Sequence, residues 1–260
     1  MGCMLAASLL ASVASVSDAT LNVPTPGGGA GRGAKPQPHL IFVMADDQGH
    51  KNGYLNPELI TPHTHEIVAE GVRFLNHYVF KFCSPTRSSF LSGRLPIHVN
   101  MENSATEQPR AGVEVNFTMI SEVLHAAGYK SAHVGKWHAG QASNLHVPKG
   151  RGFDQALSFF NFGEDHYTQI RGGNALSEEM RIGQGYDFPD GPGGGACPQA
   201  VDLWGLDGPC PLNGSYGGYI FTDEVVRVVE EHDAKSPLFM CLPRTKIVLE
   251  QCADLIACHR

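Results

Sequence analysis

The feature that most constrains the fold is a short apolar run, LIFVMA, at residues 40–45. It ends directly at two acidic residues, Asp46 and Asp47. A continuous apolar run of this length is typical of a strand buried on both faces, as parallel strands are in α/β proteins. The run therefore predicts an α/β fold with a central sheet flanked by helices.

Further elements follow along the chain. Apolar residues at helical spacing, or a Pro start with a Gly stop, predict helices at residues 61–69, 85–91, 118–127 and 222–231. Short apolar segments predict strands at 131–134 and 237–242, and an extended segment beginning at 72–75. Residues 150–218 are rich in Gly and Pro and are expected to be irregular. Alternating strands and helices again favour the α/β class.

Composition narrows the class of function. The 260 residues include 19 Lys plus Arg against 26 Asp plus Glu, with a formal charge of −7. The basic residues are scattered, so no basic surface is expected for a nucleic-acid backbone, and we predict no nucleic-acid binding. With 42% hydrophobic and 17% charged residues the chain is globular, which leaves an enzyme or a binding domain.

The first residues are typical of a secretory leader. Residues 4–16 are apolar and uncharged, and small residues follow, so we interpret residues 1–19 as a signal peptide. A buried N-terminal helix is the alternative. Pro and Gly in residues 20–37 read instead as a linker that would separate such a helix from a core. No second apolar run approaches spanning length, so no membrane span is expected.

Two other features fit the secretory pathway. Asn116 and Asn213 begin N-glycosylation sequons. Cys197 and Cys210 flank a Gly/Pro-rich stretch and would close a loop as a disulfide in an oxidising compartment, or they are two unrelated thiols. The 7 cysteines include no C-x-x-C pair, so a zinc site is not indicated.

Asp46 and Asp47 form the first candidate site. Open α/β sheets bind ligands at the carboxyl ends of their strands, and adjacent carboxylates repel each other unless a cation or hydrogen-bond donors offset their charge. Hard divalent cations prefer such oxygen ligands. The alternative is a turn or a helix cap, where Asp is common.

Cys83 and Arg87 form the second candidate site, in the segment FCSPTRSSFLSG at 82–93. If Pro85 lies in the first helical turn, Cys83 lies at the helix N-terminus and Arg87 follows one turn later on the same face. This arrangement would hold an anion beside a nucleophile. The alternative is a buried structural Cys near a surface Arg.

Lys136 and His138 form the third candidate site, just past the strand predicted at 131–134. If the chain stays extended, both side chains point to the same side, which places a fixed cation beside a titratable base. His138 is alternatively a packed neighbour of the site, since the chain has 13 His residues.

These segments resemble the type I sulfatases. CSPTR at 83–87 is similar to the first signature of that family, and GYKSAHVGKWH at 128–138 to the second. With MADDQG, ITPH, AEGVRF and KGRGFD in the same order, the chain is most similar to the arylsulfatase B branch over about residues 38–242. The resemblance implies the N-terminal part of an alkaline-phosphatase-like α/β fold.

The resemblance also implies a chemistry. Cys83 would be oxidised to formylglycine by a formylglycine-generating enzyme, and the hydrated aldehyde would attack sulfur and carry the sulfate. Asp46, Asp47 and residue 83 would bind Ca²⁺. Arg87 would position the hydrate and Lys136 would bind a sulfate oxygen. His138 would help to deprotonate the second hydroxyl, which then expels sulfate.

The implied function is a secreted or lysosome-like sulfuric ester hydrolase acting on aryl sulfates or sulfated sugars. Residues 243–260 depart from the family pattern and are expected to be a divergent tail of an incomplete domain. The alternative is therefore a truncated sulfatase fragment without activity. A related phosphate ester hydrolase is a further enzyme hypothesis. Specificity would reside in loops such as 100–116 and 165–218, whose residues do not identify a substrate.

Overall fold

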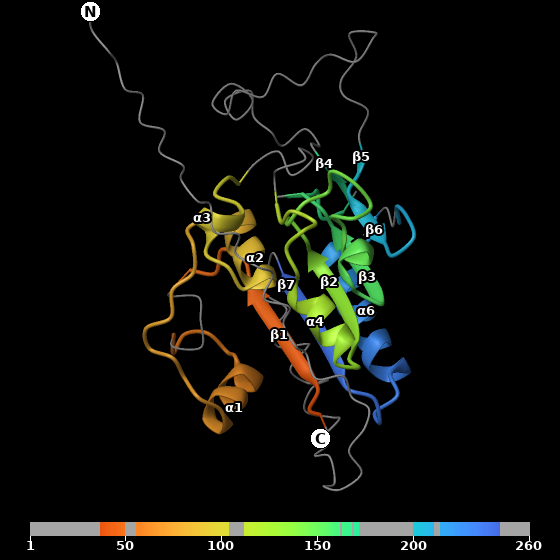
Figure 1. The fold of residues 1–260 in the computed structure, drawn as a ribbon. Helices are drawn as coiled ribbons and strands as arrows, with labels where there is room; N and C mark the ends of the chain where they lie inside the picture. The colour runs from red at the N-terminus through yellow and green to blue at the C-terminus, as the bar shows by residue number, and fades with distance from the viewer. Residues whose placement is uncertain are drawn as a thin grey trace, which may run out of the picture.

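A central sheet carries the described part of the molecule. The computed structural model describes residues 37–49, 56–103, 112–161, 163–167, 169–171, 200–210 and 214–244. Within these residues the strand order is β1-β7-β2-β3-β6 (Figure 1). The strands are β1 (Leu40–Ala45), β2 (Lys130–Lys136), β3 (Gln155–Phe159), β6 (Leu203–Gly205) and β7 (Leu238–Arg244). A separate antiparallel pair joins β4 (Ile170–Arg171) to β5 (Ala200–Val201).

The four longer strands run in parallel. β7 lies between β1 and β2, with Phe239 opposite both Leu40 and Ser131. β3 continues the parallel sheet beside β2, and β6 closes that side in the antiparallel direction. The carboxyl ends of β1, β7, β2 and β3 therefore meet at one edge of the sheet, which is where open α/β sheets bind ligands.

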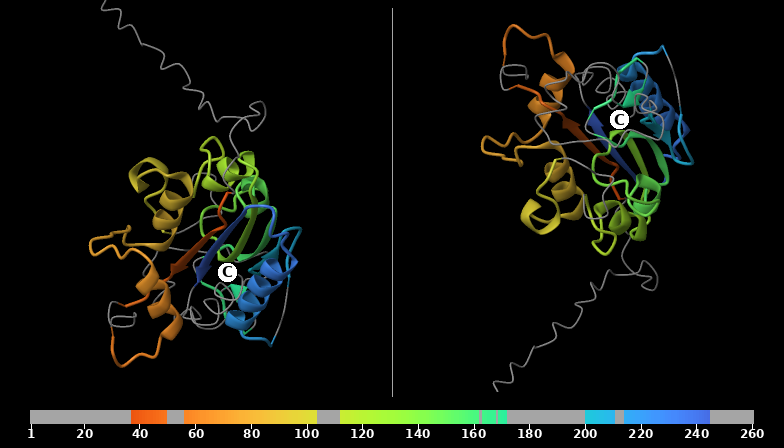
Figure 2. Two further views of the ribbon diagram at one scale, coloured as in Figure 1. Left: turned by 90° about the horizontal axis from the view of Figure 1, so that it is seen from below. Right: turned by 90° about the horizontal axis from the view of Figure 1, so that it is seen from above.

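Helices cover both faces of this sheet. They are α1 (Pro62–Glu70), α2 (Cys83–Ser92), α3 (Pro96–Val99), α4 (Ile120–Ala126) and α6 (Gly217–Glu231), with a 3-10 turn, η2 (Pro148–Arg151). Two buried apolar clusters lie on opposite faces, one with residues of α6 and the other with residues of α2 and α4. Figures 1 and 2 show α6 on the other side of the sheet from α4.

Strand β7 shows how one sequence serves both clusters. Leu238, Met240 and Leu242 belong to the cluster under α6, whereas Phe239 and Cys241 belong to the cluster under α2 and α4. Successive side chains of a strand point to opposite faces, so a continuous apolar run fills both cores. The predicted doubly covered sheet is confirmed here.

The helices and strands largely follow the sequence pattern. The helices predicted at 61–69, 85–91, 118–127 and 222–231 correspond to α1, α2, α4 and α6, although α6 begins earlier, at Gly217. The predicted strands correspond to β2 and β7. Residues 72–75 form no strand, and the interpretation of 150–218 as irregular is wrong in part, because β3 and β6 lie there.

Strand β1 is less buried than its apolar sequence predicts. Within the described residues it pairs only with β7 and is an edge strand, and Leu40 is 37% exposed. Strand β2, paired on both sides, is buried from Ser131 to Lys136. A residue's position in the sheet, which local sequence does not encode, therefore decides its burial.

Several predictions fall outside the described residues. They concern the signal peptide (1–19), nearly all of the linker (20–37), Cys197, Asn213 and the tail beyond Arg244. Strand β7 itself continues to Arg244, past the predicted domain end at 242. In the part of the chain that is described, no helix has the length and apolar character to cross a membrane.

Candidate active site

Asp46 lies at the centre of a buried polar cluster at the carboxyl end of β1, which points toward α2 (Figure 1). Its Oδ2 accepts hydrogen bonds from Lys136 Nζ at 2.8 Å and from Arg87 Nη2 at 3.0 Å. Lys136 is the last residue of β2 and Arg87 lies in α2. The parallel sheet thus brings three predicted site residues together at the edge where parallel strands end.

Cys83 and Arg87 contact the same carboxylate from one face of α2. Cys83 is the first residue of the helix, and its thiol donates to Asp46 Oδ1 over 3.6 Å. Arg87 follows one turn later and also donates from Nη1 to the carbonyl of Lys136 at 2.6 Å. Both side chains therefore lie on the side of α2 that faces Asp46, and the role of Cys83 as a nucleophile stays a prediction.

The cluster is almost closed to solvent. The side chains of Arg87, Lys136 and Asp46 are 4%, 2% and 9% exposed. Burial by itself raises the pKa of Asp46, but the nearby charges of Arg87 and Lys136 outweigh it and hold that pKa below its ordinary value. Two buried cations share one carboxylate, so the cluster has an excess of one positive charge and suits an anion.

Asp47 differs from its neighbour. It is exposed, and its φ of 55° places it in the left-handed region, so the chain turns sharply as β1 ends. Two carboxylates in sequence are hard oxygen donors of the kind Ca²⁺ prefers, but such a site needs about 6–8 oxygens. No set of three or more His, Cys, Asp or Glu side chains gathers around one point in the described residues. The two carboxylates are the type of ligand that Ca²⁺ prefers, but the described residues bring together fewer ligands than a calcium site needs.

His138 is a buried imidazole beside the cluster. It is 1% exposed, and burial, then Lys136 and Arg87, holds its pKa well below the ordinary value, so the ring is neutral at pH 7. Its φ is 47°, so the backbone is not extended as the sequence interpretation assumed. The side chain nevertheless lies within the electrostatic influence of Asp46.

Asn103 is a contributor that sequence reasoning missed. Its Oδ1 accepts a hydrogen bond from the backbone N–H of Ser84 at 2.9 Å, at the first turn of α2, where backbone donors lack helical partners. The backbone of Asn103 also hydrogen-bonds to His138. Asn103 therefore connects the start of α2 to the imidazole of His138, and no local sequence motif predicts this connection.

The remaining predicted residues lie outside the cluster. Asn116 is exposed in a turn, where a glycan has room, and its glycosylation stays a prediction. Cys210 is half-buried, and its pairing with Cys197 also stays a prediction because Cys197 lies outside the described residues. Cys241 is a buried thiol in β7, and burial raises its pKa to about 12, so it is no rival nucleophile.

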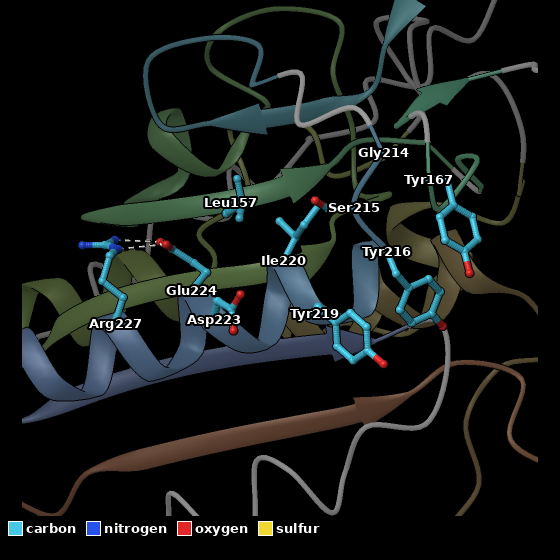
Figure 3. A pocket seen from close by; sticks show the side chains of 10 residues that line it. All are labelled: Leu157, Tyr167, Gly214, Ser215, Tyr216, Tyr219, Ile220, Asp223, Glu224 and Arg227. Atoms are coloured by element: carbon cyan, nitrogen blue, oxygen red, sulfur yellow. Dashed lines mark hydrogen bonds and ion pairs between the residues drawn. The ribbon is translucent and has the colours of Figure 1, made fainter.

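Two cavities lie away from the cluster. One, of about 810 Å³, runs along α6 as far as Arg227, with Tyr167, Tyr216 and Tyr219 gathered at one end (Figure 3). The other, of about 590 Å³, lies against β3 and β6 and contains Trp204. None of the residues predicted to be catalytic lines either cavity.

Several named proteins are similar in sequence to this chain. The sulfatase family model matches residues 38–242. Mouse arylsulfatase J is 32% identical over 214 residues, which cover 81% of this chain and 32% of that protein. Mouse arylsulfatase G is 33% identical over 178 residues, 67% of this chain and 31% of that protein. Human N-acetylgalactosamine-6-sulfatase is 35% identical over 139 residues, 49% of this chain and 26% of that protein.

Solved structures share the fold. The crystal structure of Ps i-CgsB matches with a TM-score of 0.63 and 24% identity, over 81% of this chain and 45% of that one. The alkaline-phosphatase-like α/β fold class is thereby confirmed. This chain spans about a third of the length of the arylsulfatases J and G. The match across 38–242 and the arrangement of Asp46, Cys83, Arg87 and Lys136 lead to one conclusion: the chain belongs to the sulfatase family.

Proposed function

We propose that this protein is a sulfuric ester hydrolase that removes sulfate from aryl sulfates or sulfated sugars. The observation that carries the proposal is the Cys83 thiol 3.6 Å from a carboxylate that two buried cations share. A buried excess of positive charge beside a nucleophilic position stabilises the negative charge that develops on a sulfate ester in the transition state.

Residue 83 would act as the nucleophile after maturation. Cys83 is half-buried, and we propose that a formylglycine-generating enzyme oxidises it to formylglycine. The hydrated aldehyde supplies one hydroxyl for attack and a second for release of sulfate. An ordinary Ser or Cys ester lacks that second hydroxyl and would depend on slow attack by water.

Calcium is the proposed metal. Asp46, Asp47 and residue 83 would hold Ca²⁺, which would polarise a sulfate oxygen and lower the cost of an oxyanion. The hard-oxygen character of the two adjacent carboxylates supports this assignment.

The chain's own residues supply positioning and proton transfer. Arg87 and Lys136, both held on Asp46, would orient residue 83 and bind sulfate oxygens. His138 would accept the proton of the second hydroxyl. Its neutral form suits a base, because the neutral imidazole has an unprotonated ring nitrogen.

The proposed substrates follow from the relatives. Two are named arylsulfatases and a third is named for a sulfated N-acetylgalactosamine, so we infer sulfate esters of aromatic alcohols or sugars. We place the protein in the secretory pathway, in an extracellular or lysosome-like compartment. The exposed sequon at Asn116 supports this location, since glycosylation requires an accessible acceptor.

The test combines chemistry at residue 83 with turnover. We expect mass spectrometry of protein secreted from cells that contain the converting enzyme to find formylglycine at position 83. The same material should hydrolyse an aryl sulfate, and Cys83→Ala should abolish that hydrolysis. An unmodified thiol in every peptide, or equal turnover by the variant, would overturn the proposal.

An inactive sulfatase fragment is the second candidate. It is favoured by the small number of cation ligands that the described residues bring together at Asp46 and Asp47. The two candidates differ in calcium dependence, because a ligand that binds only the folded state raises its melting temperature. A rise on adding Ca²⁺, lost in Asp47→Asn, supports the enzyme, and no rise supports the fragment. Comparing sulfate with phosphate esters tests the phosphatase hypothesis in the same assay.

A further inference from the structure

We propose that the cavity beside β3 and β6 is a saccharide-binding subsite that takes an uncharged sugar ring next to the sulfated one. We call it the Trp204 cavity, lined among others by Gln141, Lys149, Phe160, Asn161, Trp204 and Asp207. Its role as a neighbouring subsite rests on the proposed sulfatase function. Its volume of about 590 Å³ lies within the usual range for small-ligand sites, about 300–1,000 Å³.

The cavity is linked to the cluster of Asp46, Arg87 and Lys136 by the chain segment that follows β2. The chain that follows β2 stays hydrogen-bonded to the end of β3. The backbone N–H of Trp137 donates to the carbonyl oxygen of Phe159 at 2.8 Å, and that of His138 donates to the carbonyl oxygen of Phe160 at 3.2 Å. Gln141, three residues after His138, reaches the cavity and donates to Asn161 Oδ1 at 3.0 Å. The segment that carries Lys136 and His138 thus continues directly into the cavity lining.

The aromatic part of the lining suits the apolar face of a sugar. Trp204 is half-buried and stacks on Phe160 with ring centroids 5.5 Å apart and an interplanar angle of 27°. A large ring held by packing on one side offers a rigid surface at low entropic cost. Sugar rings present C–H groups on a face that packs on such a surface and hydroxyls around the rim.

The polar part of the lining suits the hydroxyl groups. The buried carboxylate of Asp202 accepts hydrogen bonds from the side chain of Asn161 at 2.9 Å and from the backbone N–H of Phe160 at 3.1 Å. These bonds hold Asn161, which in turn orients the Gln141 amide. A preorganised amide carries both donor and acceptor atoms, which is what a hydroxyl requires.

The charges favour an uncharged ring over a second sulfate. Lys149 is paired with Asp207, and both side chains are more than half exposed at the cavity. The Asp202 carboxylate accepts hydrogen bonds from the N–H donors around it, and the lining carries two carboxylates, Asp202 and Asp207, against one cation, Lys149. The lining therefore offers no unpaired cation for an anion, and we infer a neutral hexose or N-acetylhexosamine as the occupant.

The tyrosine cavity of Figure 3 provides the contrast. Its lining includes Asp223 and Glu224 against one cation, Arg227, which forms an ion pair with Glu224 at 2.7 Å (Figure 3). Arg227 also pairs with Glu231 at 2.5 Å. Its balance of two acidic residues to one basic residue equals that of the Trp204 cavity, but no residue of the segment that follows β2 lines the tyrosine cavity. Tyr219, which is 60% exposed there, is thus a matched aromatic control for Trp204.

The test measures sugar binding and does not need catalysis. The 260-residue chain carrying Cys83→Ala is titrated with an uncharged N-acetylhexosamine disaccharide and followed by tryptophan fluorescence. The chain has 2 Trp residues, and Trp137 is 0% exposed, so a change in emission reports on Trp204. Calorimetry then compares variants, with circular dichroism to verify that each is folded.

The expected result is a loss confined to the Trp204 cavity. Trp204→Ala should weaken binding about tenfold or more, the equivalent of one lost stacking contact of about 1.4 kcal/mol. Trp204→Phe should retain part of the affinity, Gln141→Ala should weaken binding less, and Tyr219→Ala should leave it unchanged. If Trp204→Ala misfolds, Trp204→Phe and Gln141→Ala provide the comparison.

Several outcomes would overturn the inference: no binding to the parent chain, equal binding by all variants, or an equal loss in Tyr219→Ala. Failure of the proposed function is a separate result. An unmodified Cys83 with no hydrolysis of sulfate esters would leave sugar binding measurable in the Trp204 cavity.

Discussion

Helices α1 and α2 start from similar local sequence and end in opposite environments. Each carries a Pro in its first turn and is followed by a Gly, at Gly71 and Gly93. None of the residues of α1 is buried, whereas α2 buries five, which are Ser84, Pro85, Arg87, Ser88 and Leu91. Local signals therefore specify that a helix forms, and the tertiary neighbours decide whether it is anchored.

The neighbours of α2 are specific. Phe90 stacks on Phe42 of β1 at a centroid distance of 3.7 Å, Asn100 donates to Ser84 at 2.7 Å, and Arg87 is bound to Asp46. Helix α1 lies away from the sheet on the β1 side (Figure 1). Large apolar side chains on that side are exposed, among them Ile60, Ile67, Val72, Phe74, Leu75 and Tyr78.

The largest expected effect comes from removing the Asp46 carboxylate, whose ion pair with Arg87 holds α2 against the end of β1. Asp46→Ala would leave Arg87 and Lys136 buried without their shared carboxylate, which we expect to cost about 3–5 kcal/mol of unfolding free energy. Urea denaturation at pH 7 measures the loss. Asp46→Asn, which keeps acceptor capacity, serves as the control and should lose less. A loss under 1 kcal/mol in the Ala variant would show that this ion-pair cluster does not anchor α2.

A matched pair of aliphatic truncations tests the contrast directly. Leu91 in α2 is 3% exposed, so Leu91→Ala should cost about 2–5 kcal/mol through lost burial and a cavity. Ile67 in α1 is 44% exposed, so Ile67→Ala should change stability by about 0.5 kcal/mol or less. Both are measured in the same urea series. Equal losses would mean that α1 is packed against something in solution.

The glycines that follow the two helices sharpen the contrast at smaller scale. Gly93 has φ 65°, in the left-handed region, with no atom within 4 Å of an added Cβ, so Gly93→Ala should cost about 1 kcal/mol in backbone strain. Gly71 has φ −106°, where an added Cβ would meet the Ile67 carbonyl oxygen at 2.9 Å. Because α1 is unpacked, Gly71→Ala should leave the global urea midpoint unchanged. A shift as large as that of Gly93→Ala would contradict this.

The smallest expected effect is the dependence of α2 stability on the ionisation of Asp46, which is absent at neutral pH and appears only in acid. The pKa of Asp46 is lower in the folded protein than in the unfolded chain, so its contribution to stability is complete above the unfolded pKa and is lost as pH falls through the folded value. Hydrogen exchange should therefore show that α2 loses protection below about pH 4, whereas the amides of α1 should be unprotected at every pH. Asp46→Asn should remove this acid dependence, and its persistence in that variant would assign it to another group.

Much of the helix pattern was readable from sequence because its causes are local. The Pro starts, the Gly stops and the helical spacing lie within a few residues of each other, and α1, α2 and α4 appear near their expected places. Strands β3 and β6 were missed because Gly and Pro around them signal loops, and their pairing is with distant residues. The extended segment expected at 72–75 has no partner strand in the described residues, so none formed there.

For the site, sequence alone determined which residue types are present and in what order: two carboxylates after an apolar run, a Cys one helical turn before an Arg, and a Lys two residues before a His. Only the tertiary structure decided that Lys136 reaches Asp46 across 90 positions, that Asn103 links α2 to His138, and that β1 is half-buried. The reason is physical. Residue identity and helical spacing are properties of neighbouring residues, whereas burial, shared charge and pKa arise from groups that meet only when the parallel strands align.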